Sequence, residues 1–407
     1  MSELKGLQPG RAWEYRAHRA AFLTGWYVRR GVNLRERVAG APQTMGEVDL
    51  LGLDFDVAMV PRLLIGECKD RKGGAKEADR VVWLLGIKSA LRAQQVLFAK
   101  PKISEGTYVW ARPLDVLLWD EAAVQTIEKH HGLDPDIGYA GSFNAPFLEG
   151  TLAAARKLSP AEAGFRRAWD YISAAFWYSP NAARTKRLPA YFEVLSRTPS
   201  IGDLARDSFV AEGLIALLVS TLTAAGHLAR VSPARAKVWV TDAFASGVAS
   251  TAALRDIAAR ADEYYRDALS KAARAGGSPV RPFDVPRLVH HIAQPPEWLN
   301  DFLELTAHLG ARPQHTNDLL RYADLLLYEQ LLAGNVIPRG VLASIASTTD
   351  RLLPLVQFGG YFLKRVWGVE APLLERLLAL NGTSRTGDDA GNAASIHTSR
   401  STTRSHI

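Results

Sequence analysis

Two carboxylates and an ammonium group lie at the ends of two apolar segments near the start of the chain. The segment "GEVDLLGL" (46–53) carries Asp49, and the segment "PRLLIGECK" (61–69) ends with Glu67 and Lys69. Both segments predict short buried β-strands, in which an isolated carboxylate is costly to remove from water. A divalent cation shared by the two carboxylates would offset that cost. The pattern therefore indicates a chemical site at the edge of a sheet.

Side-chain alternation along a strand predicts which groups face this site. Glu67 and Lys69 share one face of their strand, whereas the Cys68 side chain points to the other. If the two strands place Asp49 beside Glu67, two carboxylates and the backbone carbonyl of Cys68 converge on one point. Oxygen donors of this kind suit Mg²⁺ or Mn²⁺. Lys69 would then hold and help deprotonate a metal-bound water, which is a nucleophile for in-line attack on phosphorus.

The segments around these residues predict an α/β arrangement that positions them. Apolar spacing and turn residues predict a helix at 9–25, strands at 26–38, around Asp49 and up to Lys69, a helix at 76–93, strands at 94–100 and 114–120, and a helix at 121–132. Gly25 ends the first helix at a position that suits a left-handed residue. The predicted order is helix, three strands, helix, two strands and helix.

This order, with "EVD" on one strand and "ECK" on the next, resembles the PD-(D/E)XK nuclease superfamily, and most closely its restriction-endonuclease-like and Mrr-like branches. The resemblance covers about residues 10–125. It implies a mixed sheet flanked by helices and a metal-dependent phosphodiesterase, with Asp49 and Glu67 as ligands of Mg²⁺ (or Mn²⁺) and Lys69 as the residue that orients water. It also implies a catalytic role for an acid on the first helix, here Glu14.

One departure and several simpler interpretations accompany this resemblance. Val48 precedes Asp49 where the family pattern has Pro. Without a metal, Glu67 and Lys69 would form an ion pair at a sheet edge, and Asp49 would accept a hydrogen bond at a strand end. Glu14 would be a solvated charge on a helix surface.

Basic residues near the predicted site are candidates for binding nucleic acid. These are Arg16 and Arg19 on the first helix, and Arg71, Lys72 and Lys76 after the second segment. Such side chains neutralise phosphates, although a solvated basic face is the alternative. The net charge of +7 over 407 residues is too small to decide between them.

Composition changes along the chain and predicts its organisation. We expect an α/β nuclease-like domain at 1–135, a linker at 136–158, an all-α helical domain at 159–381 and a disordered tail at 382–407, which is rich in Ser, Thr and Gly. The helical region has no fixed-period repeat, which favours a bundle. A homo-oligomer or a partner protein bound through this region is a further expectation.

Cysteine content and hydropathy bound the location of the protein. The single cysteine, Cys68, excludes an intrachain disulfide and fits a reducing cytoplasm. The most apolar segment, 214–231, contains His227 and Arg230, so we expect a buried helix of a bundle and no membrane span.

The residues and the resemblance together predict a metal-dependent endonuclease that hydrolyses DNA, with RNA not excluded, and with a role in restriction or phage defence. The alternative is a catalytically inactive protein with a nuclease fold, which acts as a nucleic-acid-binding or assembly module. Cleavage of plasmid in the presence of Mg²⁺ separates the two.

Overall fold

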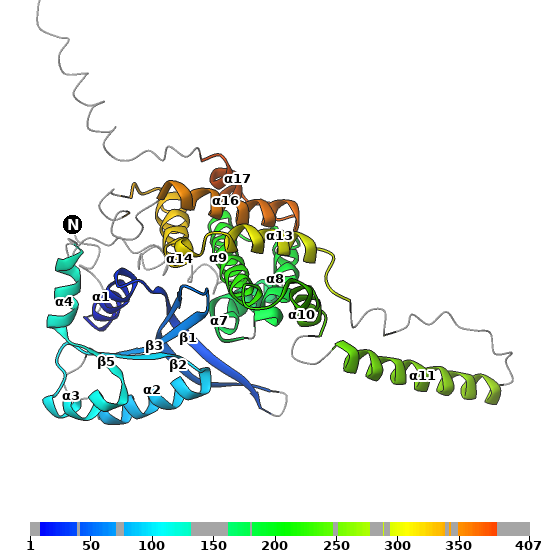
Figure 1. Cartoon of the computed structure of the whole chain (residues 1–407), viewed down its shortest axis with the longest axis horizontal. Helices are drawn as coiled ribbons and strands as arrows, with labels where there is room; N and C mark the ends of the chain where they lie inside the picture. The colour runs from blue at the N-terminus through cyan, green and yellow to red at the C-terminus, as the bar shows by residue number, and fades with distance from the viewer. Residues whose placement is uncertain are drawn as a thin grey trace, which may run out of the picture.

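The structure is a computed structural model that describes residues 9–38, 41–70, 77–131, 162–179, 181–246, 251–276, 288, 294–337, 342 and 349–380. Within these residues, a mixed sheet flanked by helices forms the N-terminal part and helices form the C-terminal part, as predicted from the sequence (Figure 1). The predicted linker at 136–158 and the predicted tail at 382–407 lie outside the described residues.

The sheet has five strands in the order β1-β2-β3-β4-β5. It follows helix α1 (Pro9–Leu23), and its strands are β1 (Tyr27–Val38), β2 (Ala41–Phe55), β3 (Pro61–Cys68), β4 (Gln95–Ala99) and β5 (Val116–Trp119). The first three strands pair antiparallel, and β4 and β5 join them in parallel. Gly25 has φ = +111°, which confirms it as the residue that ends the first helix.

Helices cover both faces of this sheet. Helix α2 (Glu77–Leu91) connects β3 to β4, and α3 (Glu105–Ala111) with the short 3₁₀ turn η1 (Arg112–Leu114) connects β4 to β5. Figure 1 shows α2 and α3 below the sheet. Helix α4 (Glu121–His130) packs against α1, and a second apolar cluster joins them to the sheet through Trp13, Ala17, Ala20, Cys68, Ala99 and Val124. The predicted elements are therefore present, with α3 as an unpredicted addition.

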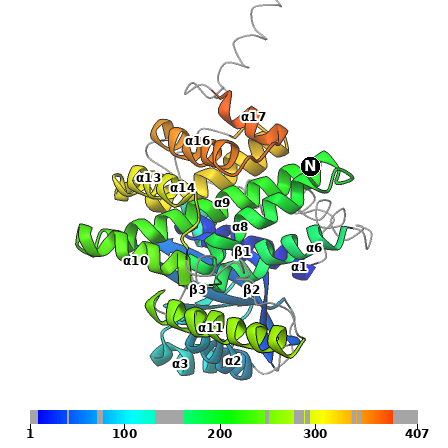
Figure 2. The same cartoon turned by 90° about the vertical axis from the view of Figure 1, so that its right-hand side faces the viewer.

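The C-terminal part is built around one apolar helix, α9 (Asp203–Leu228). Its other elements are α6 (Ala163–Asp170), the π-helical η4 (Tyr171–Ala175), α7 (Phe176–Tyr178), α8 (Asn181–Ser196), α10 (Pro233–Ser246), α11 (Thr251–Ala275), α13 (Leu299–Gly310), η5 (Pro313–His315), α14 (Thr316–Asp324), the π-helical η6 (Leu325–Leu332), α16 (Thr349–Arg365) and α17 (Pro372–Leu378). Figure 2 shows α9 among these helices, above the sheet. Helix α11 is largely exposed.

Helix α9 is the segment to consider as a possible membrane span. Among the described residues it alone is long and apolar enough to cross a membrane, and 94% of its apolar window is buried inside the protein. This burial is the behaviour expected of the central helix of a bundle, because the same apolar side chains supply the core.

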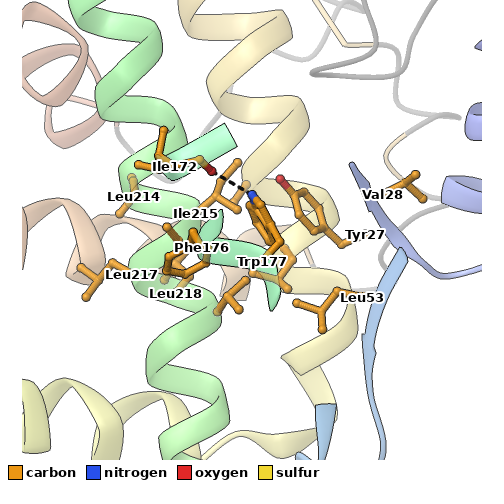
Figure 3. Packing of buried hydrophobic residues seen from close by; sticks show 14 of the residues in the cluster. Tyr27, Val28, Leu53, Ile172, Phe176, Trp177, Leu214, Ile215, Leu217 and Leu218 are labelled. Carbon is orange, nitrogen blue, oxygen red and sulfur yellow. Dashed lines mark hydrogen bonds between the residues drawn. The ribbon is translucent and has the colours of Figure 1, made fainter. Parts of the chain in front are cut away.

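One hydrophobic core runs from the sheet into the helical part. Tyr27 of β1 contacts Trp177 of α7, with ring centroids 5.6 Å apart, and Figure 3 shows this pair beside Leu214 and Ile215 of α9. At the end of β2, the backbone N–H of Phe55 donates to the side-chain oxygen of Asn317 on α14 at 2.8 Å. The helical part is therefore packed onto the sheet, and the two share this larger apolar cluster.

Candidate functional site

The antiparallel pairing of β2 and β3 brings the two predicted carboxylates together. The last paired residues are Leu50 and Gly66, so the next residue of each strand, Asp49 and Glu67, lie opposite one another at the end of the ladder. Lys69 follows on the same strand, and its backbone N–H donates to the carbonyl of Ala99 at 2.9 Å. The sheet thus extends to the residues of the predicted site.

Lys69 lies between the two carboxylates. Its Nζ is 2.7 Å from Oε1 of Glu67 and 3.3 Å from Oδ2 of Asp49. The same Oδ2 accepts the backbone N–H of Cys68 at 2.8 Å. The three residues predicted from the sequence therefore meet at one point, and the Cys68 thiol is buried in the core on the other side, as expected.

Helix α1 carries a third carboxylate, Glu14, which lies close enough to Asp49 and Lys69 for their charges to shift its pKa. Burial raises the pKa of Glu14, and the negative charge of Asp49 raises it further, whereas the charges of Arg30 and Lys69 lower it. Burial and then the charge of Asp49 also raise the pKa of Glu67. The charge of Asp49 thus disfavours ionisation of both Glu14 and Glu67, and a cation placed beside them would be stabilised.

His18 was not identified from the sequence, yet it touches two residues of the site through their backbones. Its side chain is fully buried, with Nε2 2.7 Å from the carbonyl oxygen of Asp49 and Nδ1 against the carbonyl oxygen of Glu14. Burial lowers the pKa of His18 more than these two contacts raise it. The spacing of four residues from Glu14, which places both on one helix face, is the sequence signal that indicates it.

The β1–β2 ladder is interrupted beside Asp49. Pairing holds between Arg30 and Leu50 and between Val32 and Val48, but the residue between them, Gly31, has φ = +60°. This left-handed conformation is costly for any residue with a Cβ. The register is the same on both sides, so Gly31 lies opposite Asp49 although the two are not paired.

Two further arginines belong to the site: Arg80, which the sequence did not single out, and Arg30, one of the clustered arginines of the first helix and strand that could bind phosphates near the metal. The guanidinium NH1 of Arg80 on α2 is 3.5 Å from Oε1 of Glu67, and the Arg80 side chain is 40% exposed. Arg30 on β1 is close enough for its charge to lower the pKa of Glu14. Both therefore add positive charge at the rim of the carboxylate group.

The prediction that Arg16 and Arg19 bind nucleic acid is corrected by the structure. Arg19 is fully buried, and its NH2 is 2.7 Å from Oε1 of Glu128. Arg16 donates to Glu121 at 2.7 Å and to Glu128 at 2.8 Å. Both guanidinium groups hold α1 against α4, so neither is presented to a phosphate. These pairs compensate the buried carboxylate of Glu128, which would strongly destabilise the fold if it were left unpaired.

The three remaining basic candidates, Arg71, Lys72 and Lys76, lie outside the described residues. The DNA-binding surface predicted from them is therefore a prediction that the described residues do not test.

The donor set of the site suits a hard divalent cation in its chemistry. Asp49 and Glu67 offer carboxylate oxygens, and Cys68, which follows Glu67 in sequence, offers a backbone carbonyl. Within the part of the chain that the structure describes, no group of three or more His, Cys, Asp or Glu side chains is arranged to hold a metal ion. Among the described residues, a ligand set for Mg²⁺ at this site would therefore combine two carboxylates with the main chain.

Comparison with known proteins adds no assignment to this geometry. No protein-family model, no curated protein and no solved structure matches the chain.

Proposed function

We propose that this protein is a metal-dependent endonuclease that hydrolyses DNA phosphodiester bonds. The observation that carries the proposal is the meeting of Asp49, Glu67 and Lys69 at the ends of two adjacent strands, with Lys69 Nζ 3.3 Å and 2.7 Å from the two carboxylates. Glu14 reaches the same electrostatic field from α1. This is the set of residues that the resemblance to PD-(D/E)XK nucleases requires.

The carboxylates of Asp49 and Glu67 and the carbonyl of Cys68 would hold Mg²⁺ or Mn²⁺. When bound, such an ion stabilises negative charge on phosphoryl oxygens and lowers the pKa of water. Asp49 is well suited to this task because its carboxylate is already fixed by the N–H of Cys68. Glu67 is almost fully buried and held by Lys69 and Arg80, so both ligands are preorganised.

Lys69 acts as a cation in this proposal. Burial lowers the pKa of Lys69, but its hydrogen bond to Glu67 and the charge of Asp49 outweigh burial and raise the pKa overall. The side chain is therefore an ammonium at neutral pH and would donate hydrogen bonds to a water or to a phosphoryl oxygen. It positions the attacking water and stabilises the charge that develops on phosphorus.

The rim arginines support a polyanionic substrate. Arg80 is partly exposed beside Glu67, and Arg30 lies near Glu14. Arginine binds phosphate through two N–H groups at once, and phosphate contacts orient a nucleic acid without reading its sequence. A role in restriction or phage defence rests on the family resemblance alone.

A second candidate function is favoured by the same ion pairs. Lys69 joins Glu67 and Asp49 in a network that holds together without a metal, as a catalytically inactive nuclease fold would retain for stability. Such a protein would bind nucleic acid or assemble with partners but cleave nothing.

Supercoiled plasmid incubated with the purified full chain in Mg²⁺ or Mn²⁺, with EDTA as the metal-free control, separates the two candidates. We expect metal-dependent nicking, and we expect Lys69→Ala to lower its rate about 10²–10⁴-fold while DNA binding persists. Lys88→Ala, a lysine of α2 whose nearest acid is Asp115 at 4.0 Å, is the matched control and should cleave normally. Lys69→Ala cutting at the wild-type rate would reject the site, and DNA binding with no cleavage by wild type would favour the inactive module.

A further inference from the structure

The backbone of Asp49 lies just beyond the paired part of β2 and β3, opposite a left-handed glycine of β1. On the β3 side the ladder ends one residue earlier, at Leu50 and Gly66. On the β1 side the register places Gly31 opposite Asp49, with φ = +60°, and the two are not paired. The N–H and C=O of one strand residue point to the same neighbouring strand, and a carbonyl that finds no partner there needs another donor. The Asp49 carbonyl has such a donor outside the sheet.

His18 supplies that partner from outside the sheet. Its Nε2 lies 2.7 Å from the carbonyl oxygen of Asp49, and its Nδ1 contacts the carbonyl oxygen of Glu14, one helical turn earlier. Both partners are carbonyl acceptors and a neutral imidazole carries a single N–H, so the tautomer with the proton on Nε2 is the one that donates to Asp49. One imidazole thus connects α1, which carries Glu14, to the β2 residue that carries the Asp49 carboxylate.

His18 acts through Asp49 and cannot act on a substrate. Its exposed fraction is 0%, so its ring reaches neither solvent nor a bound nucleic acid. The Asp49 carboxylate, in contrast, is partly exposed and contacts Lys69 and the N–H of Cys68. His18 thus contacts the backbone carbonyl of Asp49, whereas Lys69 and the N–H of Cys68 contact its carboxylate.

We infer that His18 is a positioning residue of the proposed site, which fixes the backbone of Asp49 so that its carboxylate faces Glu67 and Lys69. The inference rests on the proposed nuclease function for its catalytic meaning, but the positioning itself can be measured without any cleavage. Misplacement of a catalytic group by about 1 Å lowers rates about 10²-fold.

The test compares His18→Phe, which keeps a planar ring but has no donor, with His18→Gln, which keeps N–H donors on a side chain of similar reach. Phe22→Leu, at a fully buried position of the same helix, is the control for general loss of core packing. The first measurement is hydrogen exchange at the Cys68 amide, which donates to Asp49, with the Leu64 amide inside the ladder as internal reference. The second is the dissociation constant of Mn²⁺ for the full chain.

We expect His18→Phe to speed exchange at Cys68 roughly fivefold relative to Leu64, as the loss of one hydrogen bond predicts. It should also weaken Mn²⁺ binding about 10–100-fold, the usual effect of removing a group that orients a ligand. His18→Gln should recover most of both effects. Phe22→Leu should change neither the Cys68/Leu64 exchange ratio nor the dissociation constant of Mn²⁺, even where it lowers thermal stability.

The inference is overturned if the exchange rate of the Cys68 amide, relative to that of Leu64, is the same in His18→Phe as in Phe22→Leu. It is also overturned if His18→Gln shows the same faster exchange and weaker Mn²⁺ binding as His18→Phe. If His18→Phe does not fold, His18→Gln compared with Phe22→Leu decides the question from the same two measurements. A wild-type protein that neither binds Mn²⁺ nor cleaves DNA would reject the proposed nuclease. Altered Cys68 exchange in such a protein would still support the positioning role, so the two failures are distinguishable.

Discussion

At the scale of single residues, the site is a group of carboxylates that a lysine partly neutralises. Glu67 and Asp49 each lie within 3.3 Å of the ammonium group of Lys69, and Arg80 lies 3.5 Å from Glu67, yet burial and then the charge of Asp49 raise the pKa of Glu67. These positive charges therefore do not remove the repulsion between the two carboxylates. This repulsion leads to a prediction that distinguishes a metal site from a simple ion pair.

Metal binding should raise the melting temperature of wild type, and Asp49→Asn should reduce that rise. A ligand that binds only the folded state stabilises it by about 2.7 kcal/mol at a concentration of 100 times its dissociation constant. Asp49→Asn removes an anionic ligand, and it also removes the charge that raises the pKa of Glu67, so the metal-free variant should not be less stable than wild type.

Differential scanning fluorimetry of both proteins, in EDTA and in Mn²⁺, measures these differences. If the site is a structural ion pair, Asp49→Asn should be neutral or destabilising and Mn²⁺ should have no effect on either protein. Equal Mn²⁺ responses in the two proteins would show that Asp49 is not a ligand.

The sequence revealed some of these residues and not others for a physical reason. Asp49, Glu67 and Lys69 could be predicted because strand alternation and one hairpin place them, and both are local. The pairing of Arg16 with Glu128 joins residues 112 positions apart, so an arginine of α1 could not be recognised as structural. The role of His18 depends on the carbonyl of a strand 31 residues later.

At the scale of elements, α2 and α3 are joined by one carboxylate. Glu77, in the first turn of α2, accepts from Lys100 at 2.6 Å, from the Ser104 hydroxyl at 2.8 Å and from the Thr107 hydroxyl at 2.5 Å. Burial alone would raise the pKa of Glu77, but these hydrogen bonds outweigh it and lower the pKa to about 2. Ser104 also caps α3 by accepting the N–H of Thr107.

Glu77→Gln should therefore destabilise the protein by about 1.5–3 kcal/mol at neutral pH, the range for hydrogen bonds to a charged group. A carboxyl whose folded pKa is depressed contributes stability above its ordinary value of 4.5, and this contribution is lost as pH falls from 4.5 towards 2. The difference between wild type and the variant should shrink across that window.

Urea unfolding at several pH values measures this difference. Asp79→Asn, which replaces an exposed carboxylate in the same turn of α2, is the control and should change stability little. A Glu77→Gln deficit that stayed constant from pH 7 to pH 2 would contradict the assigned pKa shift.

Most elements of the sheet region were predictable because their apolar patterns are strong and bounded by turn residues. Helix α3 was missed because its seven residues, "EGTYVWA", are rich in side chains that favour strands. Its N-terminus is fixed by Ser104 and Glu77, and the second of these is 27 residues earlier in the chain. Local sequence carries little information about a helix that depends on such a partner.

At the scale of the whole molecule, a buried polar network joins the sheet to the helical part. NH1 of Arg29 on β1 is 2.7 Å from Oε2 of Glu212 on α9, and the Tyr328 hydroxyl donates to the same carboxylate. The Arg29 guanidinium also lies over the ring of Trp177, 4.9 Å from its centroid. No local pattern predicts this arrangement, because Arg29 and Glu212 are 183 residues apart.

Glu212→Ala should destabilise the whole protein by about 3–5 kcal/mol, since it leaves the buried charge of Arg29 unpaired. The double variant Arg29→Met with Glu212→Leu should lose much less, because it removes both charges and keeps apolar volume. Urea denaturation monitored by tryptophan fluorescence gives both values. A double variant as unstable as Glu212→Ala would show that lost packing, and not the unpaired charge, causes the effect.

The shared core has a mechanical consequence. Among the described residues, the sheet and α9 share one apolar cluster, so we expect the two parts to move together. Arg29 of β1 is bound to α9, and the charge of its neighbour Arg30 acts on Glu14 in the site. A ligand that shifted α9 would therefore be expected to shift β1 and, with it, the positive charge beside the carboxylates.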